Sequence, residues 1–425
     1  MKSLETLIQE LCPDGVEYVK LGDVGTFVRG NGLQKKDFTK EGVGCIHYGQ
    51  IYTRLNTFTD KTLTCCSEDL AKKLTPVHPG DLVIACTSEN IEDVCKSVAW
   101  LGEEDIVTGG HACVFSHHEN PKYIAYLLQT ENFFQQKKKY ARGVKVIDIK
   151  ISDLQKIVLP MPPLEIQAEI VRILDKFTEL EAELEAELEA RKRQYEYYRD
   201  RLLTFDTKGG VSEPVEWKKM SEVGTFFGGL SGKTKADFGD GDAFYITYMN
   251  VYSNIAVDCK NVERVRVGAE EKQNEIHFGD ALFTGSSETP DECGMSSVMC
   301  SEPAEKVYLN SFCFGFRLND DYKNKFNPKF MKHLYRGRDL RRQIIRTASG
   351  VTRFNVSKKK FGNVMLPLIP LQEQERIANI LDRFESLTTS LAAGLPAEIA
   401  ARRRQYEHYR DRLLTFRRKV ARGEK

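Results

Sequence analysis

The chain has 425 residues, which exceeds the length that one ordinary hydrophobic core supports and predicts two or three domains. Its 62 basic and 61 acidic residues give a formal charge of +1, so any nucleic-acid binding must come from local basic patches rather than from overall charge. Eleven cysteines without a C-x-x-C pair argue against a zinc site and a disulfide framework, and no apolar run approaches about 20 residues, so we expect a soluble, cytoplasmic protein without a membrane span.

Residues 1–160 have the pattern of a mixed α/β domain. Runs of β-branched and aromatic residues at 82–85 and 112–115 predict short strands, which Gly and Asp turns separate. A helical stretch is expected after Asn120-Pro121-Lys122. This region is therefore predicted to fold as a globular unit of its own.

Residues 161–205 are predicted to form one long helix. Apolar residues recur at helical spacing at Ile170, Phe177 and Leu184, and then again at Leu188, Tyr195 and Leu202. Intervals of seven broken by a single interval of four indicate a coiled-coil seam with one stutter.

Residues 206–370 repeat the α/β pattern, with predicted strands at 244–248 and 312–316 and a helical stretch after Asn327-Pro328-Lys329. Residues 371–425 are predicted to form a second long helix. Its apolar residues are Ile377, Phe384, Leu391, Tyr406 and Leu413. Gly394 and Pro396 interrupt this pattern, so we expect the helix to kink or restart there.

An internal repeat organises the whole chain. Residues 190–205 read ARKRQYEYYRDRLLTF and residues 401–416 read ARRRQYEHYRDRLLTF, a match too long and varied for a compositional accident. The similarity extends upstream, where Leu159-Pro160 and Gln167 return as Leu366-Pro367 and Gln374. The repeat predicts four segments: globular domains at 1–160 and 206–370, and helices at 161–205 and 371–425.

The order of these segments constrains their geometry. A helix of about 40 residues is about 60 Å long, so the second helix must return toward the first domain. Two matched seams that run in opposite directions predict an antiparallel coiled coil, with a domain near each end and an approximate two-fold axis. Such an axis suits a bipartite DNA target, because half-sites one helical turn apart are separated by about 34 Å.

Two patterns resemble catalytic or metal-binding motifs, but both are incomplete. Residues 228–234 read GGLSGKT, which is one residue short of a phosphate-binding P-loop because Phe227 stands where that motif requires Gly. We therefore interpret the segment as a surface loop. His111 with Cys113, His117 and His118 forms the densest histidine group, but no further ligand stands at a suitable helical spacing. We interpret these histidines as strand and turn residues.

Basic residues cluster at one equivalent place in both repeats, before Gly143-Val144 and Gly350-Val351. The first cluster comprises Lys137, Lys138, Lys139, Arg142 and Lys145, and the second comprises Arg338, Arg341, Arg342, Arg346 and Arg353. Charge runs are usually solvated faces, but a repeated Lys/Arg cluster favours contact with DNA phosphates.

Loops after the two Gly-Thr-Phe segments carry side chains that can hydrogen-bond to base edges. The candidates in the first repeat are Arg29, Asn31, Gln34, Lys35, Tyr48 and Gln50, and those in the second are Ser231, Lys233, Thr234, Lys235, Tyr248 and Asn250. The repeats differ most in these loops, as two readers of different half-sites would. Chance divergence of surface loops predicts the same difference.

The motif Leu-Pro-x-Pro-Pro-Leu-x-x-Gln at 159–167, its copy at 366–374 and the two Gln-Tyr-Glu-x-Tyr-Arg-Asp-Arg-Leu-Leu-Thr-Phe endings resemble the conserved regions of type I restriction-modification specificity subunits. The likeness spans the whole chain in the same segment order. It implies two target recognition domains, each reading half of a split double-stranded DNA sequence, held apart by antiparallel helices. It also implies partners: two methyltransferase subunits that bind S-adenosylmethionine and modify adenine, and ATP-driven, magnesium-dependent restriction subunits.

The resemblance implies that this chain is not itself an enzyme and carries no cofactor. The sequence contains no Asn-Pro-Pro-aromatic or Asp-Pro-Pro-aromatic methyltransferase motif and no intact P-loop, which a lone methyltransferase or nuclease would need. A free-standing repressor with two DNA-binding domains is the remaining alternative, and it would need no helix surface reserved for partners.

Overall fold

The computed structural model describes residues 2–205, 215–268, 270–389 and 394–419. Tertiary contacts divide the chain into two units, Met1–Glu185 with Glu398–Lys425 (unit 1) and Ala186–Ala397 (unit 2). Each unit therefore combines one of the predicted globular regions with part of each predicted helical region. The start of the second predicted domain, at 206–214, lies outside the described residues.

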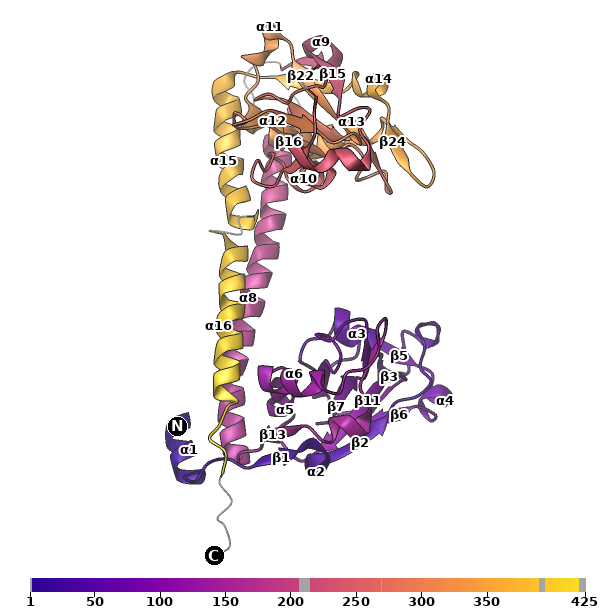
Figure 1. Ribbon diagram of the computed structural model, residues 1–425, viewed down its shortest axis with the longest axis vertical. Helices are drawn as coiled ribbons and strands as arrows, with labels where there is room; N and C mark the ends of the chain where they lie inside the picture. Colours follow the sequence, from indigo (N-terminus) through magenta and orange to yellow (C-terminus); the bar gives the residue numbers. More distant parts are fainter. Residues whose placement is uncertain (1, 206–214, 269, 390–393, 420–425) are drawn as a thin grey trace, which may run out of the picture. The chain divides into compact units, whose positions relative to one another are not determined.

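Unit 1 contains two main sheets, which Figure 1 shows in its indigo to magenta part. The larger has the order β2-β11-β7-β9-β4, with β2 (Gly25–Arg29), β11 (Ala112–His117), β7 (Leu82–Ala85), β9 (Ser97–Trp100) and β4 (Phe58–Thr59). The second has the order β5-β3-β10-β6, with β5 (Thr64–Cys66), β3 (Val43–Ile46), β10 (Ile106–Thr108) and β6 (Thr75–Val77). Antiparallel and parallel pairs occur in both sheets, so this is a mixed α/β unit.

Seven short helices accompany the sheets of unit 1 in the described residues. They are α1 (Leu4–Leu11), α2 (Leu21–Val24), α3 (Tyr48–Thr53), α4 (Glu68–Ala71), α5 (Pro121–Leu127), α6 (Glu131–Lys138) and α7 (Ile151–Leu154). The side chain of Asn120 caps α5 by accepting from the backbone N–H groups of Lys122 and Tyr123, and Pro121 occupies the first turn. This confirms the helix predicted after Asn120-Pro121-Lys122.

Unit 2 repeats the mixed architecture with its own sheets. The first has the order β15-β22-β18-β20, with β15 (Gly224–Gly228), β22 (Cys313–Leu318), β18 (Ala281–Thr284) and β20 (Ser296–Val298). The second has the order β17-β16-β21, with β17 (Glu263–Val265), β16 (Phe238–Ile246) and β21 (Val307–Leu309). Its short helices are α9 (Met220–Val223), α10 (Tyr248–Ser253), α11 (Asp320–Lys323), α12 (Pro328–Arg336), α13 (Arg338–Ile345) and α14 (Lys358–Phe361).

One part of the strand prediction for unit 2 is wrong. β16 ends at Ile246, and Tyr248 begins α10 instead of extending the strand. The reason is local, because the hydroxyl of Thr247 accepts a hydrogen bond of 3.1 Å from the backbone N–H of Asn250 and so caps a helix. Phe312 likewise precedes β22 and does not belong to the strand.

The first predicted long helix is present as α8 (Leu164–Leu202), an unbroken helix of 39 residues. Its first seam residue, Ile170, is completely buried, together with Ile166 and Leu174, in the hydrophobic core of unit 1. This end of the seam therefore packs on the globular region. The second predicted helix is present as α15 (Leu371–Thr389) and α16 (Leu395–Leu413), with Pro396 in the first turn of α16. Leu391 lies outside the described residues.

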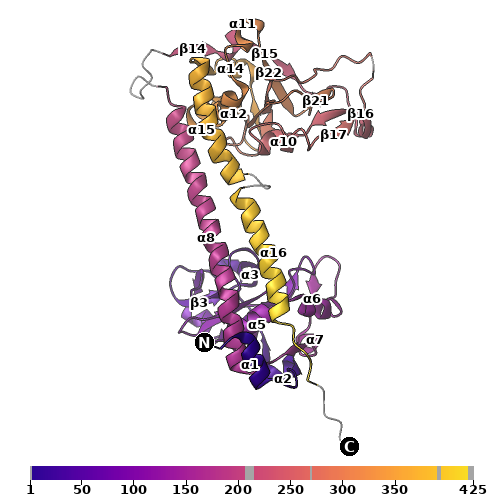
Figure 2. The ribbon, with the colours of Figure 1, turned by 90° about the vertical axis from the view of Figure 1, so that its left-hand side faces the viewer.

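Helix pairing can be described within each unit. In unit 1, the ring of Phe177 in α8 stacks on that of Tyr409 in α16 with centroids 5.6 Å apart, and Arg403 forms ion pairs with Glu181 and Glu185. Residue numbers rise along α8 as they fall along α16, so these segments are antiparallel; Figure 2 shows them side by side. In unit 2, the equivalent residues Tyr198 and Phe384 stack at 5.4 Å.

The repeated Leu-Pro motif joins each globular region to its helix. It lies on β13 (Val158–Pro160), which pairs with β1 (Tyr18–Lys20), and on β25 (Met365–Leu368), which pairs with β14 (Glu216–Lys219). Gln167 is fully buried and accepts a 3.0 Å hydrogen bond from the backbone of Asn120, and Gln374 does the same at 2.8 Å from Asn327. The motif glutamine therefore fixes the start of α5 or α12 against α8 or α15.

Both ends of the described chain meet in unit 1. The backbone N–H of Val16 donates to the carbonyl oxygen of Arg417 at 2.8 Å, and the N–H of Lys419 donates back to Val16 at 2.9 Å. Leu414, just after α16, is buried in the core of unit 1. Within the described ranges, none of the helices has the length and apolar character needed to cross a membrane.

Candidate nucleic-acid interface

One short loop has the same geometry in both units. Residues 143–146 and 350–353 are each closed by antiparallel pairing, of Arg142 with Asp148 and of Ser349 with Asn355. Each loop begins with a glycine at positive φ, where an added Cβ would lie 2.0 Å from a carbonyl oxygen of the same loop. Only glycine fits there. The next residue is Val144 or Val351, which is 95% or 91% exposed. We call these segments the Gly-Val loops.

Two further segments meet each Gly-Val loop. In unit 1, β12 (Ile147–Asp148) pairs with β8 (Thr87–Ser88), and in unit 2, β24 (Phe354–Val356) pairs with β19 (Ser286–Ser287) and with β23 (Ala348–Ser349). Tyrosines of α3 and α10 then bond to the two-residue strands: Tyr52 donates to the carbonyl of Thr87 at 2.5 Å, and Tyr248 donates to that of Ser286 at 2.8 Å. The same three segments are thus joined in both units.

The residue that precedes β11 or β22 completes the arrangement. His111 adopts a positive φ of 67°, and its Nδ1 lies 3.0 Å from the hydroxyl of Thr87. Phe312 holds the equivalent place in unit 2, where the guanidinium of Arg353 lies 5.8 Å from its ring centroid. Arg353 also donates to the Ser286 hydroxyl at 3.0 Å. We call the Gly-Val loop, the two-residue strand, the first turn of α3 or α10 and this residue the loop cluster.

Two of the predicted basic contacts point into the protein. The ammonium group of Lys137 donates to the carbonyl oxygens of Glu92 at 2.9 Å and Val94 at 2.6 Å, and burial lowers its pKa. The guanidinium of Arg341 donates at 2.7 and 2.9 Å to the carbonyls of Asp291 and Cys293, which are the equivalent residues of unit 2. Burial lowers the pKa of Arg341 too. Both cations hold the loop after β8 or β19 in place.

Three predicted base-reading side chains are also engaged internally. Gln50 is 8% exposed and bonds to the backbone of His47 and the hydroxyl of Thr64, while Asn250 is 2% exposed and donates to two backbone carbonyls. Lys233 pairs with Glu271 at 2.5 Å. The pKa of Glu271 is lowered to about 2, and the hydrogen bond from Lys233 is the largest cause. The segment that resembles a P-loop is followed only by the three-residue 3-10 helix Lys235–Asp237, so it is a loop, as predicted.

The remaining predicted side chains lie at the surface, with Tyr48 and Tyr248 half-buried. The exposed ones are Arg29, Asn31, Gln34, Lys35, Lys138, Lys139, Arg142 and Lys145 in unit 1 and Ser231, Thr234, Lys235, Arg338, Arg342, Arg346 and Arg353 in unit 2. Arg29 and Arg142 are partly neutralised, by Asp148 at 3.7 Å and by Asp153 at 3.3 Å.

The sequence analysis missed several members of the loop cluster. Phe312 and Met249 are each 59% exposed, although both are large and apolar. They line one open pocket of about 490 Å³ with Tyr248, Tyr252 and Arg353. His111 was interpreted only as a turn residue. An alignment of the residue before each strand across the repeat, His111 with Phe312, would have pointed to this position.

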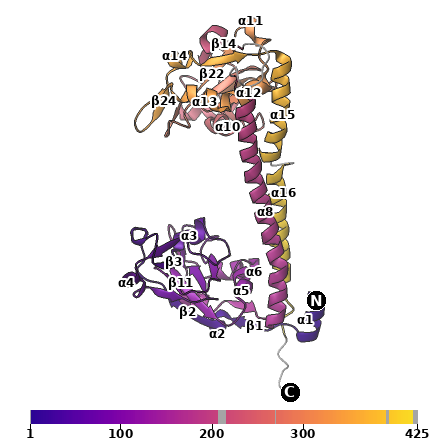
Figure 3. The same cartoon turned by 180° about the vertical axis from the view of Figure 1, so that it is seen from behind.

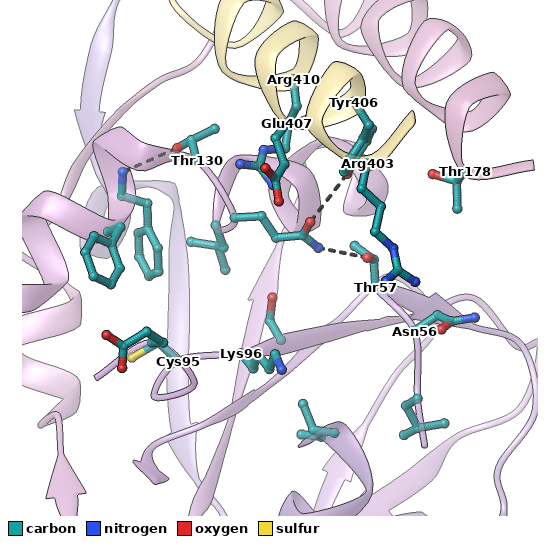
Figure 4. Close-up of a pocket in the computed structure, with 18 of the residues that line it drawn as sticks. Asn56, Thr57, Cys95, Lys96, Thr130, Thr178, Arg403, Tyr406, Glu407 and Arg410 are labelled. Carbon is teal, nitrogen blue, oxygen red and sulfur yellow. Dashed lines mark hydrogen bonds between the residues drawn. The ribbon is translucent and has the colours of Figure 1, made fainter. Parts of the chain in front are cut away.

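A larger pocket of about 650 Å³ lies in unit 1 between the globular region and the helices. Gln129 crosses it, donating to the Thr57 hydroxyl at 2.8 Å and lying 3.4 Å from the Tyr406 hydroxyl (Figure 4). Its lining mixes Lys96, Arg403 and Arg410 with several glutamates, and none of the buried polar atoms that lack a partner in the described residues belongs to it. The pocket therefore shows no recognisable ligand chemistry.

His333, Asp382 and Glu385 in unit 2 lie close enough to suggest a metal site. However, the ammonium group of Lys332 lies 2.8 Å from Asp382 and 2.7 Å from Glu385, and it supplies the positive charge that these carboxylates need. Nε2 of His333 donates to the carboxylate of Asp382 at 2.7 Å, and its Nδ1 accepts from the Tyr195 hydroxyl at 3.1 Å. The arrangement is a buried polar joint between α12, α15 and α8.

Comparison with known proteins supports one family. The model of the type I restriction modification DNA specificity domain matches this chain twice, at residues 13–190 and 213–401. The specificity subunit of the type I restriction enzyme EcoR124I/EcoR124II of Escherichia coli is 36% identical over 276 residues, which cover 62% of this chain and 63% of that protein. A chain from a solved type I restriction-modification system superimposes with a TM-score of 0.60 at 17% identity, covering 94% of this chain and 97% of the other.

The chain is thus built from two tandem copies of a DNA specificity domain. It belongs to the type I restriction modification DNA specificity family. This confirms the family resemblance and the tandem mixed α/β architecture. The matched family is described by its DNA specificity and the Escherichia coli relative is a specificity subunit, so the assignment favours a specificity subunit over a free-standing repressor.

Proposed function

We propose that this chain selects the target of a type I restriction-modification complex by contacting a bipartite DNA site, one half-site per recognition domain. The proposed domains are residues 1–160 and 206–370, with residues 161–205 and 371–425 as the helices that join them. The observation that carries the proposal is the loop cluster. The same four segments meet in both units, but the side chains that they expose differ, as expected for readers of two different half-sites.

The proposed DNA surface is smaller than the sequence suggested. Phosphate contacts are assigned to the exposed cations of α6, α13 and the segments that follow them, including the Gly-Val loops. These are Lys138, Lys139, Arg142 and Lys145 in unit 1 and Arg338, Arg342, Arg346 and Arg353 in unit 2. Base contacts are assigned to the exposed polar loops and the first helical turns, namely Arg29, Asn31, Gln34, Lys35 and Tyr48, and Ser231, Lys235 and Tyr248. Lys137, Arg341, Gln50, Asn250 and Lys233 are assigned to holding these loops.

The proposed partners supply the chemistry. Two methyltransferase subunits would bring S-adenosylmethionine, and restriction subunits would bring ATP hydrolysis and magnesium, in the cytoplasm. This chain would contribute no cofactor site and no catalytic residue. The full chain purified alone is therefore expected to show no methyl transfer, ATP hydrolysis or DNA cleavage. Activity that persisted through rigorous purification of the single chain would contradict the proposal.

Domain exchange tests the division of labour. Residues 1–160 are replaced by the corresponding domain of a relative, and the methylation pattern of the host genome is mapped by sequencing. We expect one half of the recognised sequence to change and the other half to persist, which also identifies the half-site read by each domain. Simultaneous change of both halves would rule out independent readers. Copurification of a methyltransferase with the chain tests the proposed partner, whereas a lone chain on promoter DNA would favour a repressor.

A further inference from the structure

Unit 2 exposes large apolar side chains at the centre of its loop cluster. Met249 lies in the first turn of α10, Phe312 precedes β22, and Val351 is at the tip of the Gly-Val loop; their exposed fractions are 59%, 59% and 91%. Met249 and Phe312 line the same open pocket, beside Thr352 and Arg353. Figure 3 labels α10 and β24 in this unit as seen from behind. Water-exposed apolar surface at a binding site indicates an apolar ligand group.

The exposed position of Phe312 is fixed by its surroundings. Its backbone N–H donates to the Asn310 side chain at 2.9 Å, and its carbonyl oxygen accepts from Gly285 at 2.8 Å. Arg353 lies over its ring while Nε and Nη2 donate to the Ser286 hydroxyl at 3.2 and 3.0 Å. The ring is therefore held at the pocket by bonds on both sides of its own backbone and by a cation on one face.

Two of the three equivalent positions in unit 1 are not apolar, whereas Val144 matches Val351. Gly49 stands where unit 2 has Met249, and His111 stands where unit 2 has Phe312. The Nδ1 atom of His111 lies within hydrogen-bonding distance of the Thr87 hydroxyl, so this position is polar. Exposed Met249 and Phe312 are consequently a feature of the second domain and not of the fold that both domains share. This points to a difference in what the two domains recognise.

DNA offers few apolar groups to such a pocket. Along the major groove, base-pair edges present hydrogen-bond donors, acceptors and one apolar group, the C5-methyl of thymine. Sugar-phosphate contacts need cations, whereas the lining of the pocket holds the two carboxylates Glu288 and Glu292 beside its one cation, Arg353. We infer that the second recognition domain reads the methyl group of a thymine in its half-site through Met249 and Phe312. This inference rests on the proposed function, because it requires the loop cluster to face DNA.

The test uses the full chain in complex with its copurified methyltransferase subunits, after methylation mapping and domain exchange have identified the half-site of the second domain. Duplexes carry deoxyuridine in place of each thymine of that half-site in turn, which removes only the methyl group. At one position or more, we expect binding to weaken about four-fold, the value for one buried methyl-sized group. The Phe312→His and Met249→Gly variants, which install the unit 1 residues, should bind the two duplexes equally.

Equal binding of the thymine and deoxyuridine duplexes at every position would overturn the inference, as would a half-site without an A·T pair. A discrimination that survives in both variants would overturn it too. The Arg353→Ala variant distinguishes failure of the proposed interface from failure of the thymine inference alone. If this variant binds DNA like the parent, this face does not contact DNA and the proposed interface fails. If the variant binds DNA more weakly but the parent shows no methyl discrimination, only the thymine inference fails.

Discussion

Lys137 donates a hydrogen bond of 2.6 Å from its ammonium group to the backbone carbonyl of Val94. A second bond reaches Glu92, so the cation satisfies two carbonyls of the loop that follows β8. The neighbouring Lys138 is exposed and has no such role. Two adjacent lysines of one predicted DNA-binding cluster thus have different physical functions.

The first prediction separates those functions. Lys137→Met leaves buried carbonyls without a donor, so it should lower the free energy of unfolding by about 1–3 kcal/mol. Lys138→Ala should change stability by less than about 0.5 kcal/mol but weaken DNA binding and reduce the slope of log affinity against log salt by about one. Thermal unfolding and salt-dependent binding measure the two effects. If Lys137→Met left stability unchanged and altered only the salt slope, Lys137 would be a phosphate contact after all.

The contrast between these lysines explains what the sequence could reveal. The repeat, the long helix α8 and the break near Pro396 depend on spacing along the chain, so they were predictable. The roles of Lys137 and Arg341 depend on a loop that lies about 45 residues away in sequence and touches them only in the folded unit. Tyr248 was assigned to a strand because its aromatic neighbours resemble one, but the Thr247 cap starts a helix there. Phe312 was not recognised as a surface residue, because a phenylalanine beside a predicted strand is expected to be buried.

A second prediction compares two equivalent positions, Arg336 in unit 2 and Gln129 in unit 1. Arg336 stands nine residues after Asn327, where Gln129 stands nine after Asn120. Arg336 donates to the carbonyls of Ser296, Tyr252 and Val251 at 2.9, 2.8 and 3.2 Å, and burial lowers its pKa to about 10. Arg336→Met should therefore destabilise unit 2 by about 3 kcal/mol.

Gln129→Ala is the matched control in unit 1. It loses one good hydrogen bond, to Thr57, and should cost about 1 kcal/mol. The two tryptophans make the measurement specific, because Trp100 belongs to unit 1 and Trp217 to unit 2. Fluorescence-monitored unfolding of variants that retain one tryptophan should show the larger shift at Trp217 for Arg336→Met. Equal losses of unfolding stability from both substitutions would show that Arg336 does not stabilise its unit more than Gln129 does.

The third prediction is a pH dependence in unit 2. Burial lowers the pKa of His333 despite the opposing carboxylate of Asp382, and Lys332 lowers it further. Burial raises the pKa of Asp382, but hydrogen bonds from His333 and Lys332 outweigh it, so that pKa is lowered overall. Because the folded pKa of His333 is below its unfolded value of about 6.5, the unfolded state binds more protons below that pH. The contribution to stability is complete above about pH 6.5 and is lost as pH falls through the folded pKa.

His333→Gln provides the test, because an amide can accept from the Tyr195 hydroxyl and donate to Asp382 without titrating. Unfolding followed at Trp217 should lose stability as pH falls below about 6.5 in the parent and much less in the variant. Asp382 contributes its own loss only near and below about pH 4, where parent and variant should respond alike. In unit 1, the equivalent Tyr126 bonds to Asp175 at 2.7 Å and does not titrate in this range. An identical acid response in parent and variant would exclude His333 as its source.

The last prediction concerns the length of α8, which is unbroken from Leu164 to Leu202 and passes from unit 1 into unit 2. Deleting residues 182–185 removes one AELE unit from the AELEAELE sequence at 182–189, so the residues that then follow Glu181 have the same identities. Glu189 takes the place of Glu185, and the ion pairs of Arg403 with α8 can form again. The local pairing in unit 1 should therefore survive the deletion.

The remainder of the helix, however, begins about 6 Å earlier and is rotated by about 40°, because four residues exceed one turn of 3.6. Base pairs rise by about 3.4 Å, so we expect the nonspecific spacer between the half-sites to change by one or two base pairs. Both half-site sequences should stay the same, because the loop clusters are unaltered. Methylation mapping of the deletion variant measures spacer and half-sites together, and unfolding followed at Trp100 controls for the integrity of unit 1. Altered half-site bases with an unchanged spacer would mean that the length of α8 does not set the spacing.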